Sequence, residues 1–183
     1  MPGAATVARA LAAACLLAAA LGLAGCGGGG DGTRTQTHGE TEAAADYFVG
    51  KADGIGASVD FAAADRVTRA LAAAMSRDAA RPVVVGVAAI LNDSSHAAPL
   101  PVLVGVLGDG TTVPLTSGWE ALAGRDDPGA RRARALLPLP GPLAPDETTA
   151  VYLTLPRSRA TRLAGVRMRT AAGSVVDLDP QAR

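Results

Sequence analysis

The chain has 183 residues, 49% of them hydrophobic, and its 17 basic residues balance 17 acidic ones. This length is sufficient for a domain with its own apolar core. The balanced charge gives no sign of the strongly basic surface that nucleic-acid binding requires, so we expect no nucleic-acid partner.

The first 25 residues have the order of an export signal. Arg9 supplies positive charge, residues 10–20 form an apolar run, and residues 21–25 are small or apolar. This order is typical of a secretory signal peptide, and the apolar run is shorter than the roughly 20 residues that span a bilayer. The four residues that end at Cys26, Leu-Ala-Gly-Cys, closely resemble the lipobox of bacterial lipoproteins.

The lipobox resemblance implies that Cys26 is the lipidation site. Its thiol would be diacylglycerated, cleavage would remove residues 1–25, and the freed amine could also be acylated. Two or more acyl chains hold a protein stably on a membrane, so we expect an extracytoplasmic protein, anchored to a membrane of the bacterial cell envelope. Since Cys15 is the only other cysteine, the mature chain could form no internal disulfide and no cysteine-ligated zinc site.

Residues 26–45 are predicted to be a disordered tether. They begin with a glycine-rich run and continue into a polar stretch at residues 33–42, with almost nothing apolar to bury. A flexible linker of about 20 residues has a root-mean-square reach of roughly 25 Å. His38 lies in this tether, where we expect it to be solvated.

The next segments predict a strand, a helix and a second strand. Residues 55–61 alternate between apolar and small or polar, which is the period of a half-buried strand. Asp65 can cap a helix that places Val67, Leu71 and Met75 on one face, and Pro82 prevents its continuation. Residues 83–91 are apolar on both faces and rich in β-branched side chains, so we expect a central strand there.

The second half predicts more short strands around one long connection. Residues 102–107 and 111–115 are predicted to form a hairpin about a Gly-Asp-Gly turn, and strands are predicted at 151–155, 166–169 and 175–178. The 117–145 connection is predicted to contain a short helix at 130–137 and then prolines in an extended rail. Connections of this length are usually functional or mobile. The pattern predicts a mainly β protein whose domain, residues 46–183, is an antiparallel β-sandwich with one helical insertion.

The order of strands and turns from residue 54 to 178 resembles a known group of domains. An apolar strand ends in Asn92-Asp93, a strand leads into Asp109-Gly110, and residues 143–147 contain leucine, proline and acidic residues ahead of the next strand. This order resembles the uncharacterised immunoglobulin-like domains that many exported bacterial lipoproteins carry. The group usually has glycine where Asp146 stands. The resemblance implies a binding or accessory module with no defined chemistry.

The sequence offers no catalytic set. Ser95-His96 lies in a predicted exposed turn, and neither a Gly-x-Ser-x-Gly elbow nor a phosphate-binding loop is present. Met75 and Met168 are expected to fill core gaps. The acidic pairs at 126–127 and 146–147 lack the spacing of a calcium loop. We therefore expect no catalytic residue, no metal and no cofactor.

Arg125, Arg131, Arg132 and Arg134 form the one local charge cluster. The cluster has two interpretations: a solvated helix face, offset by the acidic pair at 126–127, or a contact for anionic lipid headgroups or wall polymers. Trp119, near this cluster, is expected in the core.

Three functions remain open from the sequence. The first is a non-enzymatic, lipid-anchored envelope protein whose sandwich binds an envelope protein or wall polymer. The second is a lipoprotein that binds a small ligand or metal under the 117–145 insert. The third is an envelope hydrolase that uses carboxylates such as Asp60, Asp109 or Asp126.

Overall fold

The structure, a computed structural model, describes residues 46–76 and 82–181. The predicted signal peptide, the lipidation site at Cys26, the tether at 26–45 and His38 lie outside the described residues.

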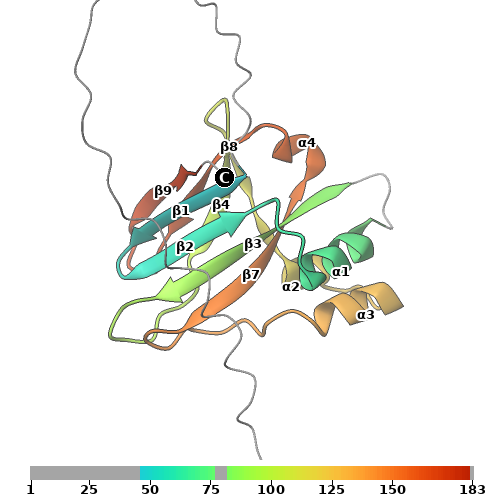
Figure 1. Cartoon of the computed structure of the whole chain (residues 1–183), viewed down its shortest axis with the longest axis horizontal. Coiled ribbons are helices and arrows are strands. Elements are labelled where there is room, and N and C mark those ends of the chain that lie inside the picture. Colours follow the sequence, from blue (N-terminus) through green and yellow to red (C-terminus); the bar gives the residue numbers. More distant parts are fainter. Residues whose placement is uncertain (1–45, 77–81, 182–183) are drawn as a thin grey trace, which may run out of the picture. The chain divides into compact units, whose positions relative to one another are not determined.

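The described residues form one antiparallel sheet with the strand order β5-β4-β8-β9-β1-β2-β3-β7-β6 (Figure 1). Every pairing between neighbours is antiparallel. The strands are β1 (Tyr47–Ala52), β2 (Ile55–Asp60), β3 (Val83–Asn92), β4 (Val102–Leu107), β5 (Thr112–Pro114), β6 (Thr116–Ser117), β7 (Thr148–Pro156), β8 (Leu163–Arg169) and β9 (Val175–Pro180).

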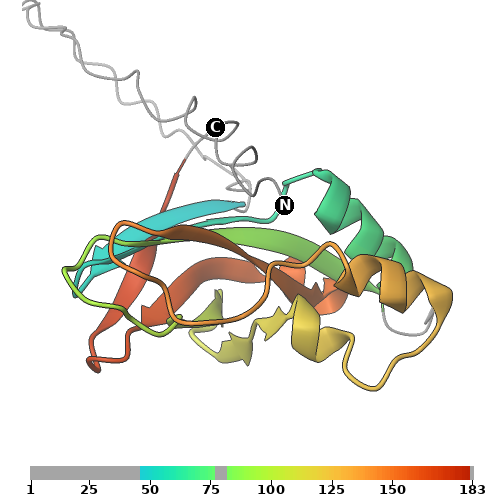
Figure 2. The same ribbon diagram turned by 90° about the horizontal axis from the view of Figure 1, so that it is seen from below.

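The sheet folds over on itself at the junction of β1 and β9. These strands pair only at Phe48 with Pro180 and Val49 with Asp179. Beyond this point a Cβ atom on Gly50 would lie 2.6 Å from the Leu178 side chain, so glycine permits the close crossing. The two halves of the sheet then face each other as two layers (Figure 2).

An inner cluster of buried apolar side chains fills the space between the two halves. Phe48, Val59 and Ile90 come from one half, and Val166 and Met168 from the other, each with at most 1% of its surface exposed. Alternation along each strand sends these residues to a single face of the sheet. Burial of large aliphatic groups contributes about 1.5–3 kcal/mol each, so this cluster is the main source of stability.

An outer cluster lies on the opposite face of β3 and β7, beneath helices. The helices are α1 (Arg66–Met75), α2 (Gly118–Ala121), α3 (Pro128–Arg134) and α4 (Arg157–Ala160). α1 and α3 lie side by side at one end of the sheet (Figures 1 and 2). Leu71, Val85, Leu122 and Tyr152 are buried there, with Ala130 and Ala133 between them.

The structure confirms the mainly β, antiparallel prediction and most of its elements. β3 is an interior strand, with one face on the inner cluster and one end of its other face under the helices. α1 begins at the predicted cap, since Asp65 accepts a hydrogen bond from the Thr68 N–H at 2.7 Å. The third helix lies at 128–134, not 130–137, because Asp127 caps it and Pro128 occupies its first turn. Within the described ranges, no helix is long and apolar enough to cross a membrane.

Candidate functional site: a pocket at the open seam of the sheet

β7 has one fully paired edge and one edge that is mostly open. On the first edge, every residue from Thr148 to Pro156 lies opposite a residue of β3. On the second edge, β6 reaches only Leu153 and Thr154. The stretch at 148–152 therefore has no strand partner on this side.

The two ends of the sheet are joined through Leu115. β5 is one edge strand and β6 is the other, and Leu115 is the single residue between them in the chain. The sheet is thus nearly closed at this point. Further along, residues 148–152 of β7 and residues 100–103 at the start of β4 are not joined by a strand, and we call this gap the seam.

A pocket of about 370 Å³ lies at the seam. Its walls come from residues 100–103, 117–120, 137–143 and 149–153, together with Ile90, Leu115 and Glu147. A cavity of this size falls within the range that holds small ligands. The pocket touches both apolar clusters, since Leu103 and Leu153 belong to the inner one and Leu137 and Tyr152 to the outer one.

Residues 137–143, Leu-Pro-Leu-Pro-Gly-Pro-Leu, form one wall, which we call the rail. At its start, the Trp119 Nε1–H donates to the Pro138 carbonyl at 2.7 Å. At its end, Leu143 exchanges two backbone hydrogen bonds with Ala98, of 2.8 and 2.9 Å. Between these anchors Leu139 is 82% exposed.

Asn92 ties the end of the rail to β3. Its side chain is fully buried, and Nδ2 donates to the carbonyls of Leu143 at 3.0 Å and His96 at 2.7 Å. Its Oδ1 accepts a hydrogen bond from the Ser94 hydroxyl at 2.6 Å. Because a buried amide is costly to leave unpaired, these bonds fix one border of the pocket.

Charge at the pocket comes from two exposed carboxylates. Among the described residues that line it, Glu120 and Glu147 are the charged ones, and neither belongs to an ion pair there. Glu147 Oε2 accepts a hydrogen bond from the Ala144 N–H at 2.7 Å. The pocket is therefore mainly apolar with an acidic rim.

Tyr152 connects the pocket wall to α1. Its hydroxyl donates to Asp65 Oδ2 at 3.2 Å, while the other oxygen of Asp65 caps the helix. Burial, followed by the nearby Asp65 carboxylate, raises the pKa of Tyr152 from an ordinary 10 to about 12. The phenol therefore keeps its proton to a higher pH than an ordinary tyrosine, and it ties the pocket wall to α1.

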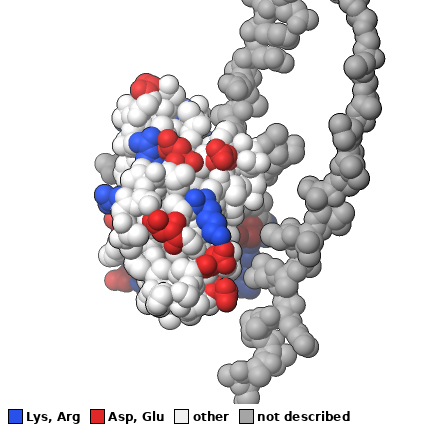
Figure 3. All heavy atoms as spheres, turned by 90° about the vertical axis from the view of Figure 1, so that its left-hand side faces the viewer, with Lys and Arg blue, Asp and Glu red and all other residues white. Residues whose placement is uncertain are grey.

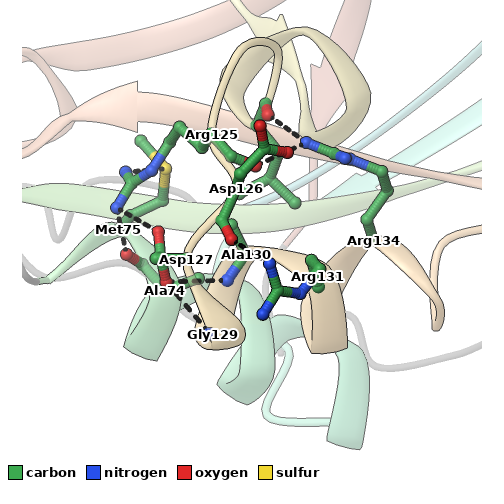
Figure 4. Close-up of polar contacts among 10 residues, drawn as sticks. Ala74, Met75, Arg125, Asp126, Asp127, Gly129, Ala130, Arg131 and Arg134 are labelled. Atoms are coloured by element: carbon green, nitrogen blue, oxygen red, sulfur yellow. Dashed lines mark hydrogen bonds and ion pairs between the residues drawn. The ribbon is translucent and has the colours of Figure 1, made fainter.

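In the arginine cluster, Arg125 binds the insert to α1, whereas Arg134 holds loop carbonyls within the insert (Figure 4). Arg125 Nη2 donates to the Ala74 carbonyl at the end of α1 at 2.9 Å and lies 3.5 Å from Asp127 Oδ2, while Nη1 lies 3.5 Å from Met75 Sδ. Arg134 Nη2 donates to the carbonyls of Leu122 at 2.5 Å and Arg125 at 2.9 Å.

The two remaining arginines differ from each other. Arg131 donates to the Asp126 carbonyl, whereas Arg132 has no polar partner in the described part of the chain. The side chains of Arg125 and Arg134 are only half-exposed and hold loop carbonyls, so a purely solvated helix face does not describe them. The predicted contact with anionic lipid or wall polymer stays a prediction, and Arg132 is the member most available for it.

The other candidate residues lie apart from the pocket. Ser95 Oγ is 2.9 Å from His96 Nδ1, and both residues are exposed in a turn as expected. Met168 is in the inner core, and Met75 packs half-buried against the outer cluster. None of Asp60, Asp109 and Asp126 lines the pocket. Within residues 46–76 and 82–181, no group of three or more His, Cys, Asp or Glu is placed to hold a metal ion.

Charged side chains are mixed on the face shown in Figure 3, where basic and acidic groups alternate without a continuous patch of either sign. Exposed ion pairs join Lys51 to Asp93, and Arg162 to Asp109 at 2.5 Å. Hydrogen bonds from Thr111, followed by the charge of Arg162, lower the pKa of Asp109. Such pairs contribute little stability each, and this face offers no strong field to a charged partner.

Comparison with known proteins adds no family. No protein-family model matches the chain, and no curated protein is similar to it. A solved structure of a conserved hypothetical protein from Bacillus anthracis is similar at 8% sequence identity with a TM-score of 0.38, over 76% of this chain and 100% of that chain. A likeness this weak carries no argument about function.

The pocket itself was not predicted from the sequence, although two of its signals were present. The rail was recognised as extended, but its alternating prolines were not connected with an unpaired strand edge. Trp119 was expected in the core, and it lies half-buried on the pocket wall with its indole N–H bonded to the rail.

Proposed function

We propose that this protein is a lipid-anchored, non-enzymatic protein of the bacterial cell envelope that binds an apolar ligand in the seam pocket. The observation that carries the proposal is the pocket of about 370 Å³, mainly apolar, between the open edge of β7 and the rail. This is the second of the functions that the sequence left open, with the 117–145 insert forming part of the wall.

Two features of the site support binding without catalysis. The pocket-lining phenol, Tyr152, is held protonated by burial and by Asp65, so it is a poor base. The two rim carboxylates, Glu120 and Glu147, are exposed, which keeps them away from the desolvated surroundings that prepare a carboxylate for acid or base catalysis. The site can therefore hold a ligand by burial and shape.

The membrane anchor rests on the sequence motif at Cys26. A thioether lipid requires the cysteine thiol, so Cys26→Ser should leave the protein without its lipid and unprocessed at this site. Mass spectrometry of the protein from its native host checks this, and an unmodified wild-type Cys26 would contradict the anchor.

We also propose a relationship with the immunoglobulin-like domains of exported lipoproteins. Each motif that carried the resemblance coincides with a strand end or turn: Asn92 ends β3, and Asp109-Gly110 turns β4 into β5. Asp146 has a φ of 58°, a left-handed conformation that glycine adopts most easily. This accounts for the glycine that the resembling domains have at that position.

The binding proposal is tested with a neutral apolar probe and a matched pair of variants. Thr149 lines the pocket, whereas its exposed neighbour Thr148 does not. The probe N-phenyl-1-naphthylamine should quench the fluorescence of Trp119, the chain's one tryptophan, in the full chain carrying Cys26→Ser. Thr149→Phe should abolish the quenching by filling the pocket, and Thr148→Phe should preserve it. Equal quenching in both variants would refute the pocket as the binding site.

A further inference from the structure

The hydrogen-bonding groups of β7 can be assigned to its two edges. Just outside the strand ladder, Asn92 N–H donates to the Glu147 carbonyl at one end, and Arg157 N–H donates to the Pro82 carbonyl at the other, both at 2.9 Å. Partners in an antiparallel ladder alternate between bonded and non-bonded pairs. Counting in from both ends gives the same result: Thr149 and Val151 bond to β3, while Ala150 and Tyr152 direct their N–H and C=O groups toward the seam.

The rail does not complete the ladder on this edge. Prolines stand at every second position, 138, 140 and 142, and proline has no N–H to donate. In the described part of the chain, no backbone hydrogen bond joins the rail or residues 100–103 to Ala150 or Tyr152. The β6–β7 register places Gly118 opposite Tyr152 as the next bonded pair, so the seam-facing backbone groups that remain open to another partner are those of Thr148 and Ala150.

The geometry points to an extended peptide, apolar and basic in alternation, that adds as a strand to the open edge of β7. This inference rests on the proposed function and names its ligand class. Backbone groups of Thr148 and Ala150 would bond the added strand, and alternate side chains of that strand would enter the pocket. Residues 148–152 would accommodate a segment of about five residues, roughly 17 Å long.

Charge at the rim selects the basic character of the peptide. Glu120 and Glu147 are unpaired carboxylates among the lining residues, and no lysine or arginine of the described chain lines the pocket. A cleft lined by one sign of charge attracts the opposite sign. A peptide with apolar side chains toward the pocket and lysines between them matches both the walls and the rim.

Binding is measured on the full chain carrying Cys26→Ser, through Trp119 fluorescence. The probe is the acetylated, amidated hexapeptide Lys-Leu-Lys-Leu-Lys-Leu, which contains no tryptophan. We expect saturable binding that weakens as salt rises, because screening reduces the attraction to exposed carboxylates. The combined change Glu120→Gln and Glu147→Gln should weaken binding and remove most of the salt dependence, and so should replacement of the lysines by glutamine.

Backbone pairing is tested on the peptide and on the protein. Two peptides are compared, one N-methylated at its odd-numbered residues and the other at its even-numbered residues. Only one of these sets of N–H groups faces β7, so methylation of that set should weaken binding about tenfold and methylation of the other less than threefold. Ala150→Pro removes a seam-facing N–H that is not part of the ladder with β3, and should weaken binding about tenfold. Ala150→Ser retains that N–H and is the control.

The outcomes separate this inference from the proposed function. If N-phenyl-1-naphthylamine binds in a manner that Thr149→Phe abolishes while the hexapeptide does not bind, the pocket stands and the peptide is wrong. Equal effects of the two N-methylated sets would likewise overturn strand addition, even if the peptide binds. If both probes fail to bind, both proposals are wrong. The inference is supported if the two N-methylated peptides bind unequally and if Ala150→Pro weakens binding while Ala150→Ser does not. The N-methylation result is obtained on the protein without a change at Ala150, so it does not depend on whether Ala150→Pro folds.

Discussion

The inner and outer sides of the β3–β7 ribbon are both buried, but by different means. On the inner side, strands from the far half of the sheet supply large side chains such as Met168 and Leu163. On the outer side, α1 and α3 cover only one end of the ribbon, and small alanine side chains lie at their contact. The Arg125 guanidinium links the end of α1 to the start of α3, through the Ala74 carbonyl and Asp127. The inner side is held by hydrogen-bonded strands, whereas the outer side depends on a long insert whose loops are fastened by polar contacts.

This difference explains where the pocket lies. Strand pairing closes the inner side almost completely, but β6 is too short to complete the edge of β7. The insert that builds the outer side passes this edge, and its proline-rich rail lines the pocket without pairing to the edge. The seam therefore lies where the inner side, which is closed by paired strands, borders the outer side, which is covered by the insert.

The largest effect is expected from a charge placed under the helices. Val85 is 7% exposed in the outer cluster, and Val85→Asp should unfold the domain, because an unpaired buried charge costs several kcal/mol against a total of roughly 5–15 kcal/mol. Ala89 lies on the same face of β3 but is exposed beyond the helices, so Ala89→Asp should cost about 1 kcal/mol. Thermal unfolding by circular dichroism compares the two, and an unchanged melting temperature in Val85→Asp would mean that the outer side is not a core.

Truncation of one leucine on each side measures how rigidly each side is held. Leu155 on the inner side and Leu71 on the outer side are both fully buried. We expect Leu155→Ala to lower the free energy of unfolding by about 4 kcal/mol and Leu71→Ala by about 2–3 kcal/mol, since helices can shift to close a cavity more readily than paired strands can. Urea unfolding gives both values. A larger loss for Leu71→Ala would reverse the comparison.

The polar fastening of the insert is tested by two arginines from one cluster. Arg125→Gln should lower the free energy of unfolding by about 1–2 kcal/mol, because the Ala74 carbonyl and Asp127 lose a charged donor. Arg132→Gln should change it by less than about 0.5 kcal/mol. The same pair also bears on the predicted anionic-surface contact: salt-dependent binding to anionic vesicles that Arg132→Gln weakens would support that contact.

The last expected effect is confined to alkaline pH. The folded state holds the Tyr152 proton up to about pH 12, whereas an unfolded tyrosine releases it near 10. The free energy of unfolding should therefore be steady below pH 10 and fall as pH rises from 10 toward 12. Tyr152→Phe should remove this decline, which urea unfolding at pH 9 and pH 11 can measure. An identical slope in both proteins would show that Tyr152 is not the group responsible.

Sequence reasoning was most accurate where local rules determine structure. Alternation identified β2, the doubly apolar run identified β3 as central, and the cap at Asp65 identified α1. β1 was missed because its alternation is interrupted by Gly50 and Lys51, and its place in the sheet is fixed by β2, not by its own pattern. The seam depends on the pairing of β6 and β7, which lie more than thirty residues apart in the chain. No local sequence pattern indicates that β6 is too short to cover the edge of β7.

The single-residue connection at Leu115 also limits the size of the gap between the two edges of the sheet. Since β5 continues into β6 through one buried residue, the covalent chain fixes the spacing of the two sheet edges at that point. At the far end of the gap, the backbone hydrogen bonds between Ala98 and Leu143 and the buried Asn92 amide fix the position of the rail. The gap is therefore bounded at both of its ends, and the distance between these two boundaries limits the length of any occupant.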